Sequence, residues 1–389
     1  MVSLPTIAPA PAAIESIEVD ERDWCLSTTS GWTAMVDAAP RTRPPALSTA
    51  QIAALAPAAR SRYQHARAVW HANLGPIRTP GVEAIFDSLD DICGANRQDG
   101  DKVKPAAVLD ALPGLGKTTA ATAFGRVFHR QQIDLHGRSV PTDDGVWQRI
   151  PVVYIGLTAN TTLRSLSAML CRFYALPAAD RGNAVRLSHR AAECVAHCKT
   201  RLIIVDDVHF LDINRRDGRE VANHFKWLAN TFPVTFFFVG VGLRARGLLD
   251  EGLSGADAVF SQTARRWNVL TLQPFTATTD TDRRVWRNLL LSIERQLVLA
   301  EHHRGMLADD LSDYLFARST GHFASLMSLI SRGCYRAVKT GAEALTAGLL
   351  DDVRIDEAAE TARQHLHAAI LAGQVRTRPT STPAPAGAS

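Results

Sequence analysis

The sequence lacks a long apolar run, since no stretch approaches the ~18 consecutive apolar residues that a membrane-spanning helix needs. It also lacks a basic cluster at its start, where residues 1–14 are rich in proline and alanine, so no secretory signal is expected. Cysteine is scarce, and its six residues are scattered, which is typical of reduced thiols. These absences argue against the membrane and secreted classes, and we expect a cytoplasmic protein without a membrane partner.

Charge of one sign is not dominant either. Lysine and arginine number 43 against 39 aspartates and glutamates, and this net charge of +4 does not by itself indicate a nucleic-acid partner. What the chain does have is size and apolar content, with 389 residues of which 46% are hydrophobic. This is enough to bury the cores of two folded units.

One group of metal-binding residue types stands out. Cys194, His197 and Cys198 fall on one face of an expected helix, an arrangement that could form part of a metal site. No second pair lies at the spacing of a zinc site, so half-buried helix residues are the favoured interpretation.

The most informative motif lies between Ala111 and Thr119, which read Ala-Leu-Pro-Gly-Leu-Gly-Lys-Thr-Thr directly after the apolar run 106–109. An apolar strand, a glycine-rich turn, a lysine, a hydroxyl and a helix in this order form a backbone site for phosphate groups. Lys117 would reach the β- and γ-phosphates of ATP, and the Thr118 hydroxyl would bind Mg²⁺. Ala111 replaces the first glycine of G-x-x-x-x-G-K-[ST], which is a minor departure. The residues predicted to bind ATP are Pro113, Gly114, Leu115, Gly116, Lys117, Thr118 and Thr119.

A second motif runs from Arg201 to His209. It begins with a basic residue, continues with four apolar residues, and then has two carboxylates, Asp206 and Asp207. The apolar run predicts a strand buried on both faces, which would bring Asp206 to the carboxyl edge of a parallel sheet. There Asp206 would hold Mg²⁺ opposite Thr118. Asp207 stands where many ATPases carry the glutamate that orients the attacking water, and its shorter side chain predicts slow hydrolysis. Without the phosphate loop, a pair of solvated acids after a buried strand would be the default interpretation.

Strands alternate with helices through the middle of the chain. Apolar runs predict strands at 150–157, 202–205, 234–239 and 269–272, with helices at 160–174, 184–198 and 221–230 between them, whereas 131–148 is polar and predicts a hairpin or flap. This order indicates a right-handed, doubly wound parallel sheet flanked by helices. From about residue 276 the patterns are helical throughout.

These patterns divide the chain into five segments. We expect an irregular N-terminal extension at 1–48, a helical segment leading into the core at 49–104, and a P-loop ATPase core at 105–275. A small all-helical lid at 276–365 and a mostly disordered tail at 366–389 complete the prediction.

An α/β nucleotide domain followed by a small helical unit resembles the AAA+ ATPases. That resemblance implies a nucleotide held between core and lid, often at a subunit boundary, with an arginine supplied by the neighbouring subunit. Arg265 and Arg266 lie just before the strand 269–272, where such an arginine finger usually stands, and Arg266 is favoured. A pair of surface arginines beside the buried Trp267 is the alternative.

Several shorter stretches resemble, in order, the TniB/TnsC family, which are AAA+ ATP-binding proteins of transposons related more distantly to MuB. They are residues 63–67 and 76–80, the acidic box 206–211, the segments 225–230 and 238–242, the arginine-containing segment 262–275, and residues 319–323.

Three positions depart from the AAA+ pattern. The strand end Gly240-Val241-Gly242 carries no polar side chain that could sense the γ-phosphate, and Ala324 stands where many AAA+ proteins place a second sensor arginine. Asp207 replaces the commoner glutamate. Together these departures favour slow, regulatory hydrolysis of ATP to ADP and phosphate.

The resemblance implies a target-DNA selector that assembles as a ring or filament on duplex DNA without sequence preference and recruits a transposase with an integrase-type core. Contacts with DNA would be mainly to phosphates, and the candidates are Arg164, Arg172, Arg215, Arg216 and Arg219. For each of these taken singly, a solvated surface arginine is the favoured interpretation. Two alternatives remain open: a signalling or defence P-loop NTPase that gates a protein partner without DNA, and a helicase-loader or origin-type ATPase.

Overall fold

The computed structural model describes residues 19–98, 102, 104–143, 145–211, 216–244 and 267–379. The chain forms two compact units. The sheet unit comprises Asp23–Ala39 and Pro80–Gln273, and the helical unit comprises Met1–Arg22, Pro40–Thr79 and Pro274–Ser389. Among the described residues, no helix combines the length and apolar character needed to cross a membrane.

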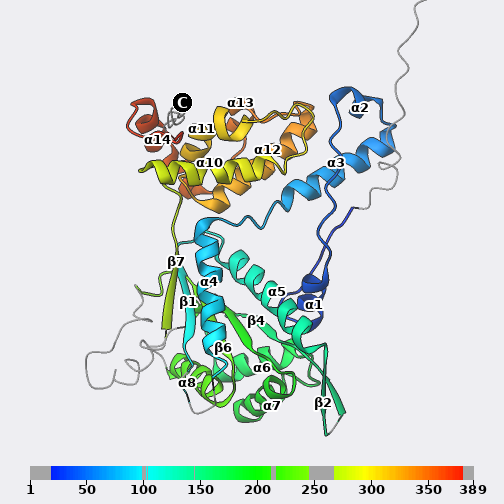
Figure 1. Cartoon of the computed structure of the whole chain (residues 1–389), viewed down its shortest axis with the longest axis vertical. Coiled ribbons are helices and arrows are strands. Elements are labelled where there is room, and N and C mark those ends of the chain that lie inside the picture. Colours follow the sequence, from blue (N-terminus) through cyan, green and yellow to red (C-terminus); the bar gives the residue numbers. More distant parts are fainter. Residues whose placement is uncertain are drawn as a thin grey trace, which may run out of the picture. The chain divides into compact units, whose positions relative to one another are not determined.

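The sheet unit is built on a five-stranded sheet in which every neighbouring pair is parallel, in the order β4-β5-β6-β1-β7 (Figure 1). The strands are β1 (Ala106–Ala111), β4 (Val152–Gly156), β5 (Leu202–Asp206), β6 (Thr235–Gly240) and β7 (Trp267–Leu272). Every residue of β5 and β6 is buried, as expected for strands covered on both faces. The predicted parallel sheet is therefore confirmed.

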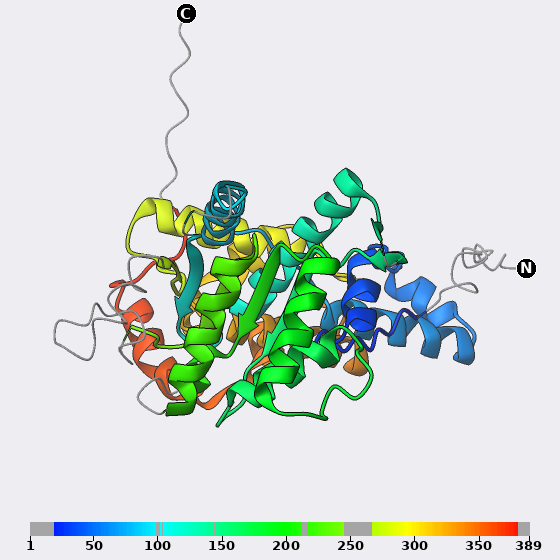
Figure 2. The same ribbon diagram turned by 90° about the horizontal axis from the view of Figure 1, so that it is seen from below.

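Helices cover both faces of this sheet. The chain crosses from β1 to the far edge strand β4 through one helix and returns through the others, so right-handed crossovers place these helices on opposite faces. Figure 2 shows α4 and α5 on one face and α6, α7 and α8 on the other. The bounds are α4 (Pro80–Ala95), α5 (Lys117–His136), α6 (Leu163–Phe173), α7 (Ala184–His197) and α8 (Arg216–Thr231). The predicted hairpin consists of β2 (Ser139–Thr142) and β3 (Gly145–Gln148).

The structure differs from the prediction near the N-terminus, where a helix, α1 (Thr29–Asp37), lies inside the segment expected to be irregular. The Thr28 side chain caps α1 by accepting a hydrogen bond from Gly31 N, and Trp32 is fully buried. A Cβ on Gly125 of α5 would lie 2.9 Å from the Trp32 ring, so the absence of a side chain there allows the two to pack. Tertiary packing stabilises this short helix. The composition of the segment does not indicate such packing, so the sequence did not predict the helix.

Helices make up the second unit. They are α2 (Thr49–Ala54), α3 (Pro57–Ala72), α10 (Asp280–Glu294), α11 (Ser312–Ser319), α12 (Phe323–Thr340), α13 (Ala347–Asp351) and α14 (Glu357–Leu371), with a short π-helical turn, η4 (Met306–Asp310). The segment expected at 49–104 divides at Thr79, because α2 and α3 belong to the helical unit and α4 to the sheet unit.

The C-terminal segment is ordered further than predicted. α14 runs to Leu371, and Thr377 is buried, with its amide 3.0 Å and its hydroxyl 2.6 Å from Asp313 Oδ1. These bonds join positions far apart in the chain, so the composition of 366–379 could not indicate them.

A buried ion pair joins α3 to the rest of the helical unit. Arg67 donates to both carboxylate oxygens of Glu343, at 2.6 and 3.0 Å, and neither residue is more than 4% exposed. The Arg67 guanidinium also lies over the Tyr63 ring, 4.6 Å from its centroid. α3 is thus part of this unit's core.

We predict that acid weakens the sheet unit through His129, which accepts a 3.1 Å hydrogen bond from Trp32 Nε1 at its Nδ1. Burial lowers the pKa of His129 from 6.5 to about 4; the charge of Arg138 acts in the same direction and Asp37 opposes it. Between these values the unfolded chain binds a proton that the folded chain does not, so stability is lost as pH falls from 6.5 towards 4. His129→Gln should reduce this loss in urea unfolding measured at pH 7 and pH 4.5. His136→Gln, an exposed histidine on the same helix, serves as the control and should leave the loss unchanged.

Candidate nucleotide-binding site

The turn between β1 and α5 has the backbone of a phosphate site. Gly114 and Gly116 take left-handed conformations, with φ of 74° and 83°, which a residue with a side chain rarely adopts. Gly116 is the N-cap of α5, a helix of 20 residues, and offers no side chain to satisfy the first amide groups. Those amides and the positive end of the helix favour an anion at this point.

The structure explains why alanine is tolerated at position 111 in place of the first glycine of the phosphate-loop motif. Ala111 is the last residue of β1 and pairs with Leu272 of β7, so it lies in extended backbone where a methyl group is tolerated. The turn begins after it, with Leu112 53% exposed and Leu115 buried in the core. Leu115 therefore anchors the loop while the residues around Gly114 face solvent.

Thr118 and Asp206 lie side by side. The Thr118 hydroxyl donates to Asp206 Oδ2 at 2.7 Å, and the amide of Asp207 donates to Asp206 Oδ1 at 2.8 Å. Asp206 is 3% exposed at the end of β5. A hydroxyl and a carboxylate oxygen side by side match the donor set that Mg²⁺ takes beside bound phosphates.

Lys117 lies against its own loop, where Nζ donates to the Leu112 carbonyl at 2.7 Å. Burial lowers the pKa of the Lys117 ammonium, and the nearby carboxylates of Asp206, Asp110 and Asp207 oppose this shift. The Lys117 side chain therefore lies at the turn, near three carboxylates.

Asp207 occupies a strained position directly after the strand. Its φ of 58° is left-handed, and its side chain is 52% exposed, with Oδ1 3.9 Å from Nδ1 of His209. Burial of part of the side chain raises the pKa of Asp207, and the neighbouring charge of Asp206 adds to the rise. The predicted role of Asp207 in orienting water stays a prediction.

Three of the predicted arginines, Arg265, Arg266 and Arg215, lie outside the described residues. Gly240 ends β6 as expected, and Ala324 is exposed in the first turn of α12.

Sequence reasoning missed Asp110, which joins the phosphate-loop strand to the turn after β6. Its carboxylate accepts from the amides of Leu243 and Arg244, both at 3.0 Å. A carboxylate inside the otherwise apolar run before the phosphate loop was the available signal.

Sequence reasoning also missed Tyr154 of β4, whose hydroxyl donates to Asp206 Oδ2 at 2.9 Å. Gly156 pairs with Asp206, and Tyr154 lies on the same face as Gly156 because side chains alternate along a strand. The sequence shows a tyrosine hydroxyl within an apolar strand. Its partner depends on the register between β4 and β5, which the sequence does not give.

The cysteine and histidine group on α7 is packed into the sheet unit. Cys194 and Cys198 are buried, burial raises the pKa of both thiols, and His197 stacks on Trp147 with ring centroids 4.7 Å apart. Within the ranges that the structure describes, no cluster of three or more histidine, cysteine, aspartate or glutamate side chains could hold a metal ion.

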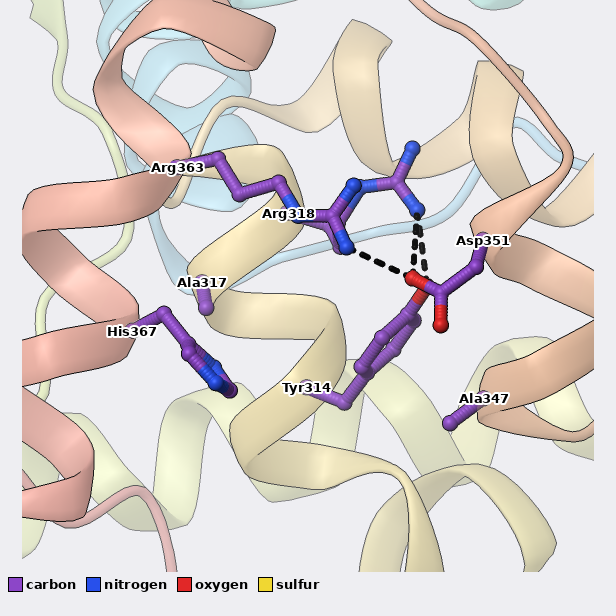
Figure 3. A pocket seen from close by; sticks show the side chains of 7 residues that line it. All are labelled: Tyr314, Ala317, Arg318, Ala347, Asp351, Arg363 and His367. Carbon is purple, nitrogen blue, oxygen red and sulfur yellow. Dashed lines mark hydrogen bonds and ion pairs between the residues drawn. The ribbon is translucent and has the colours of Figure 1, made fainter.

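A pocket of about 250 Å³ lies in the helical unit (Figure 3). Its polar groups bind one another: Arg318 donates to the Tyr314 hydroxyl at 2.7 Å, and both Tyr314 and Arg363 donate to Asp351 Oδ1, at 2.9 and 2.6 Å. Arg318 is 1% exposed and also donates to the Leu350 and Val353 carbonyls. These groups therefore hold α11, α13 and α14 together.

A parallel sheet with a glycine turn, a lysine and a hydroxyl at the end of one strand, and an acidic pair at the end of another, defines a P-loop nucleotide-binding site of the AAA+ fold. The sequence agrees, because residues 101–249 match the family described as AAA domain. This match indicates a P-loop ATPase that binds ATP, typically with Mg²⁺.

Two solved structures from Aeropyrum pernix share the fold. The ORC1 protein in complex with DNA has a TM-score of 0.53 and 14% identity, and the match covers 80% of this chain and 72% of that chain. The ORC2 protein in its ADPNP-ADP complexes has a TM-score of 0.50 and 12% identity, covering 80% of this chain and 85% of that one. No curated protein sequence matches the chain.

Proposed function

We propose that the chain is an ATP-binding, slowly hydrolysing AAA+ ATPase that assembles on duplex DNA and selects target DNA for a partner transposase. The observation that carries the ATP-binding part is the 2.7 Å hydrogen bond between the Thr118 hydroxyl and Asp206 Oδ2, beside the lysine of a phosphate loop. These groups come from two motifs far apart in the sequence, and a nucleotide site needs them together.

Each residue has a defined task in this proposal. The amides of the loop after Gly114 and the ammonium of Lys117 bind the phosphates. Thr118 and Asp206 hold Mg²⁺, which neutralises charge on the phosphate oxygens. Asp207 orients the attacking water.

Hydrolysis is slow because several contacts that speed it in other AAA+ proteins are reduced. Asp207 is shorter than glutamate, and the β6 end at residues 240–242 has no polar side chain. Arg266 of a neighbouring subunit, with Arg265 as the alternative, completes the site in the assembled state and neutralises developing charge on the phosphoryl group.

The DNA-binding part has two supports. Stretches of the sequence resemble, in order, the TniB/TnsC proteins of transposons, and the ORC1 protein, which shares the fold, was solved in complex with DNA. Contact with DNA is to phosphates, and no sequence preference is expected.

The four candidate contact arginines within the described residues are exposed, and three of them make intramolecular bonds that a phosphate would compete with. Arg164 donates to the carbonyls of Asp180 and Gly182, and Arg172 pairs with the Asp180 carboxylate at 2.9 Å. On α8, the Arg216 side chain is 86% exposed and pairs with Glu220, and Arg219 is exposed. Surface pairs of this kind are weak enough to exchange for DNA phosphates.

Co-sedimentation with linear duplex DNA tests the proposal. With ATP and Mg²⁺ the protein should pellet with DNA of any sequence, and binding should fall steeply with salt, because each phosphate contact releases counterions. With ADP or without nucleotide it should stay in the supernatant. No binding at low salt would argue for the signalling NTPase instead. Binding that is equal with and without nucleotide would contradict control of DNA binding by ATP.

An origin-type or helicase-loading ATPase is the second candidate, favoured by the ORC1 and ORC2 folds. The two candidates differ in the protein that the DNA-bound assembly recruits. A transposase with an integrase-type core should be retained on ATP-loaded assemblies if target selection is correct. Retention of a replicative helicase, with no retention of the transposase, would favour the second candidate.

A further inference from the structure

The two oxygens of the Asp206 carboxylate are held from different elements. Oδ1 accepts the amide of Asp207 at 2.8 Å, whereas Oδ2 accepts the hydroxyls of Thr118 at 2.7 Å and Tyr154 at 2.9 Å. Thr118 belongs to the phosphate loop, whereas Tyr154 lies outside both sequence motifs. Tyr154 belongs to β4, the strand that pairs with β5. The carboxylate is 3% exposed, so these protein donors set its orientation.

The Tyr154 hydroxyl is the donor in this hydrogen bond, because a carboxylate oxygen accepts.

The Tyr154 ring is itself held by the N-terminal helix. Trp32 of α1 stacks on it, with ring centroids 6.1 Å apart and planes 10° from parallel. Trp32 is fully buried, and its indole N–H donates to His129 Nδ1 at 3.1 Å.

Carbonyl groups at the end of α1 are bound by α5. Arg130 Nε donates to the Val36 carbonyl at 2.8 Å, and Arg126 donates to the Ala38 carbonyl at 2.6 Å. An unbroken set of contacts thus runs from α5 through α1 and Trp32 to Tyr154 and the Asp206 carboxylate.

We propose that Tyr154 is a positioning residue that orients the Asp206 carboxylate for Mg²⁺, and that Trp32 of the N-terminal segment holds Tyr154 in place. This inference rests on the proposed function, in which Thr118 and Asp206 hold the metal beside ATP. A hydrogen-bond donor on a ligating carboxylate fixes its direction and tunes its affinity for the metal. The segment 23–39 is thereby a support of the nucleotide site.

The Mg²⁺ dependence of ATP binding tests this inference in the full-length chain. The affinity for a fluorescent ATP analogue is measured over a range of free Mg²⁺ for wild type and Tyr154→Phe, which removes one hydroxyl and keeps the ring. In Tyr154→Phe the half-saturating Mg²⁺ concentration should rise about 10-fold, which is typical when a residue that hydrogen-bonds to a metal ligand is removed. Affinity without Mg²⁺ and the melting temperature should change little.

Tyr174→Phe is the matched control. Tyr154 is partly buried and Tyr174 is buried, and both belong to the sheet unit. The Tyr174 hydroxyl bonds Thr200 Oγ1 at 2.7 Å, away from Asp206. This variant should keep the wild-type Mg²⁺ requirement. If Tyr154→Phe behaves like Tyr174→Phe while the wild type shows Mg²⁺-dependent binding, the inference is wrong and the proposed function stands. If the wild type binds no ATP, the proposed function and the inference fail together.

Trp32→Leu tests the second part of the inference. It should raise the Mg²⁺ requirement in the same direction, because the ring that holds Tyr154 is removed. In the double variant with Tyr154→Phe the shift should be no larger than in Tyr154→Phe alone, because both act through one hydroxyl. Fully additive shifts would overturn the role given to Trp32.

Discussion

Lys117→Ala is expected to weaken ATP binding by about 100-fold, or about 3 kcal/mol, because it removes a charged partner of the phosphates from a partly buried site. The ammonium lies at the loop, 2.7 Å from the Leu112 carbonyl, and three carboxylates lie close enough to shift its pKa. Alanine keeps the helical backbone of α5, so the fold should be retained. Isothermal titration with ATP and Mg²⁺ measures the loss.

Lys339→Ala is the control for this variant. Lys339 is an exposed lysine in the last turn of α12, so its replacement changes the net charge equally without touching the phosphate loop. ATP affinity should stay at the wild-type value. Equal affinities of Lys117→Ala and wild type would show that the phosphate loop does not bind the nucleotide.

Arg67→Met is expected to destabilise the helical unit by about 3–5 kcal/mol, because it leaves the buried Glu343 carboxylate without its cation. Glu343 is 4% exposed, and apart from Arg67 its Oε2 accepts the Ala300 amide at 3.0 Å. One backbone amide does not replace a guanidinium bound through two hydrogen bonds. Urea unfolding of the full-length chain, followed by circular dichroism, measures the change.

Two further variants separate charge from packing. Glu343→Gln added to Arg67→Met removes the stranded charge and should recover much of the lost stability. Arg336→Met breaks an exposed pair with Asp352 in the same unit and should cost less than about 1 kcal/mol. A double variant as unstable as Arg67→Met alone would mean that packing of the Arg67 side chain, and not its charge, is what matters.

The sheet and the phosphate site could be predicted because their signals are local and strong. Fully apolar runs such as 202–205 can only be buried, and alternation with helices leaves a parallel sheet as the arrangement. Both motifs lie at the carboxyl edge of one sheet, after β1 and β5, which are separated only by β6, and there the Thr118 hydroxyl bonds Asp206. The capping box of α6, built by Thr162 and Ser165, is a local feature of the same kind, because its two residues lie three positions apart.

The remainder depends on contacts between distant positions. α1 is a short helix whose stability comes from burying Trp32 against α5, and Arg67 looks like a surface arginine until Glu343 is placed beside it. Tyr154 needs the β4–β5 register before its partner can be named. In each case the partner residue lies far away in the sequence, so the residues around the first position do not indicate the interaction.

In the proposed function, the nucleotide bound at Lys117 and Asp206 controls association with DNA. Electron microscopy of the protein on plasmid DNA, with ATP, with ADP and without nucleotide, tests it most directly. We expect DNA-bound rings or filaments with ATP alone, and none for Lys117→Ala under any condition. Binding of ATP without any DNA-bound assembly at low salt would contradict it.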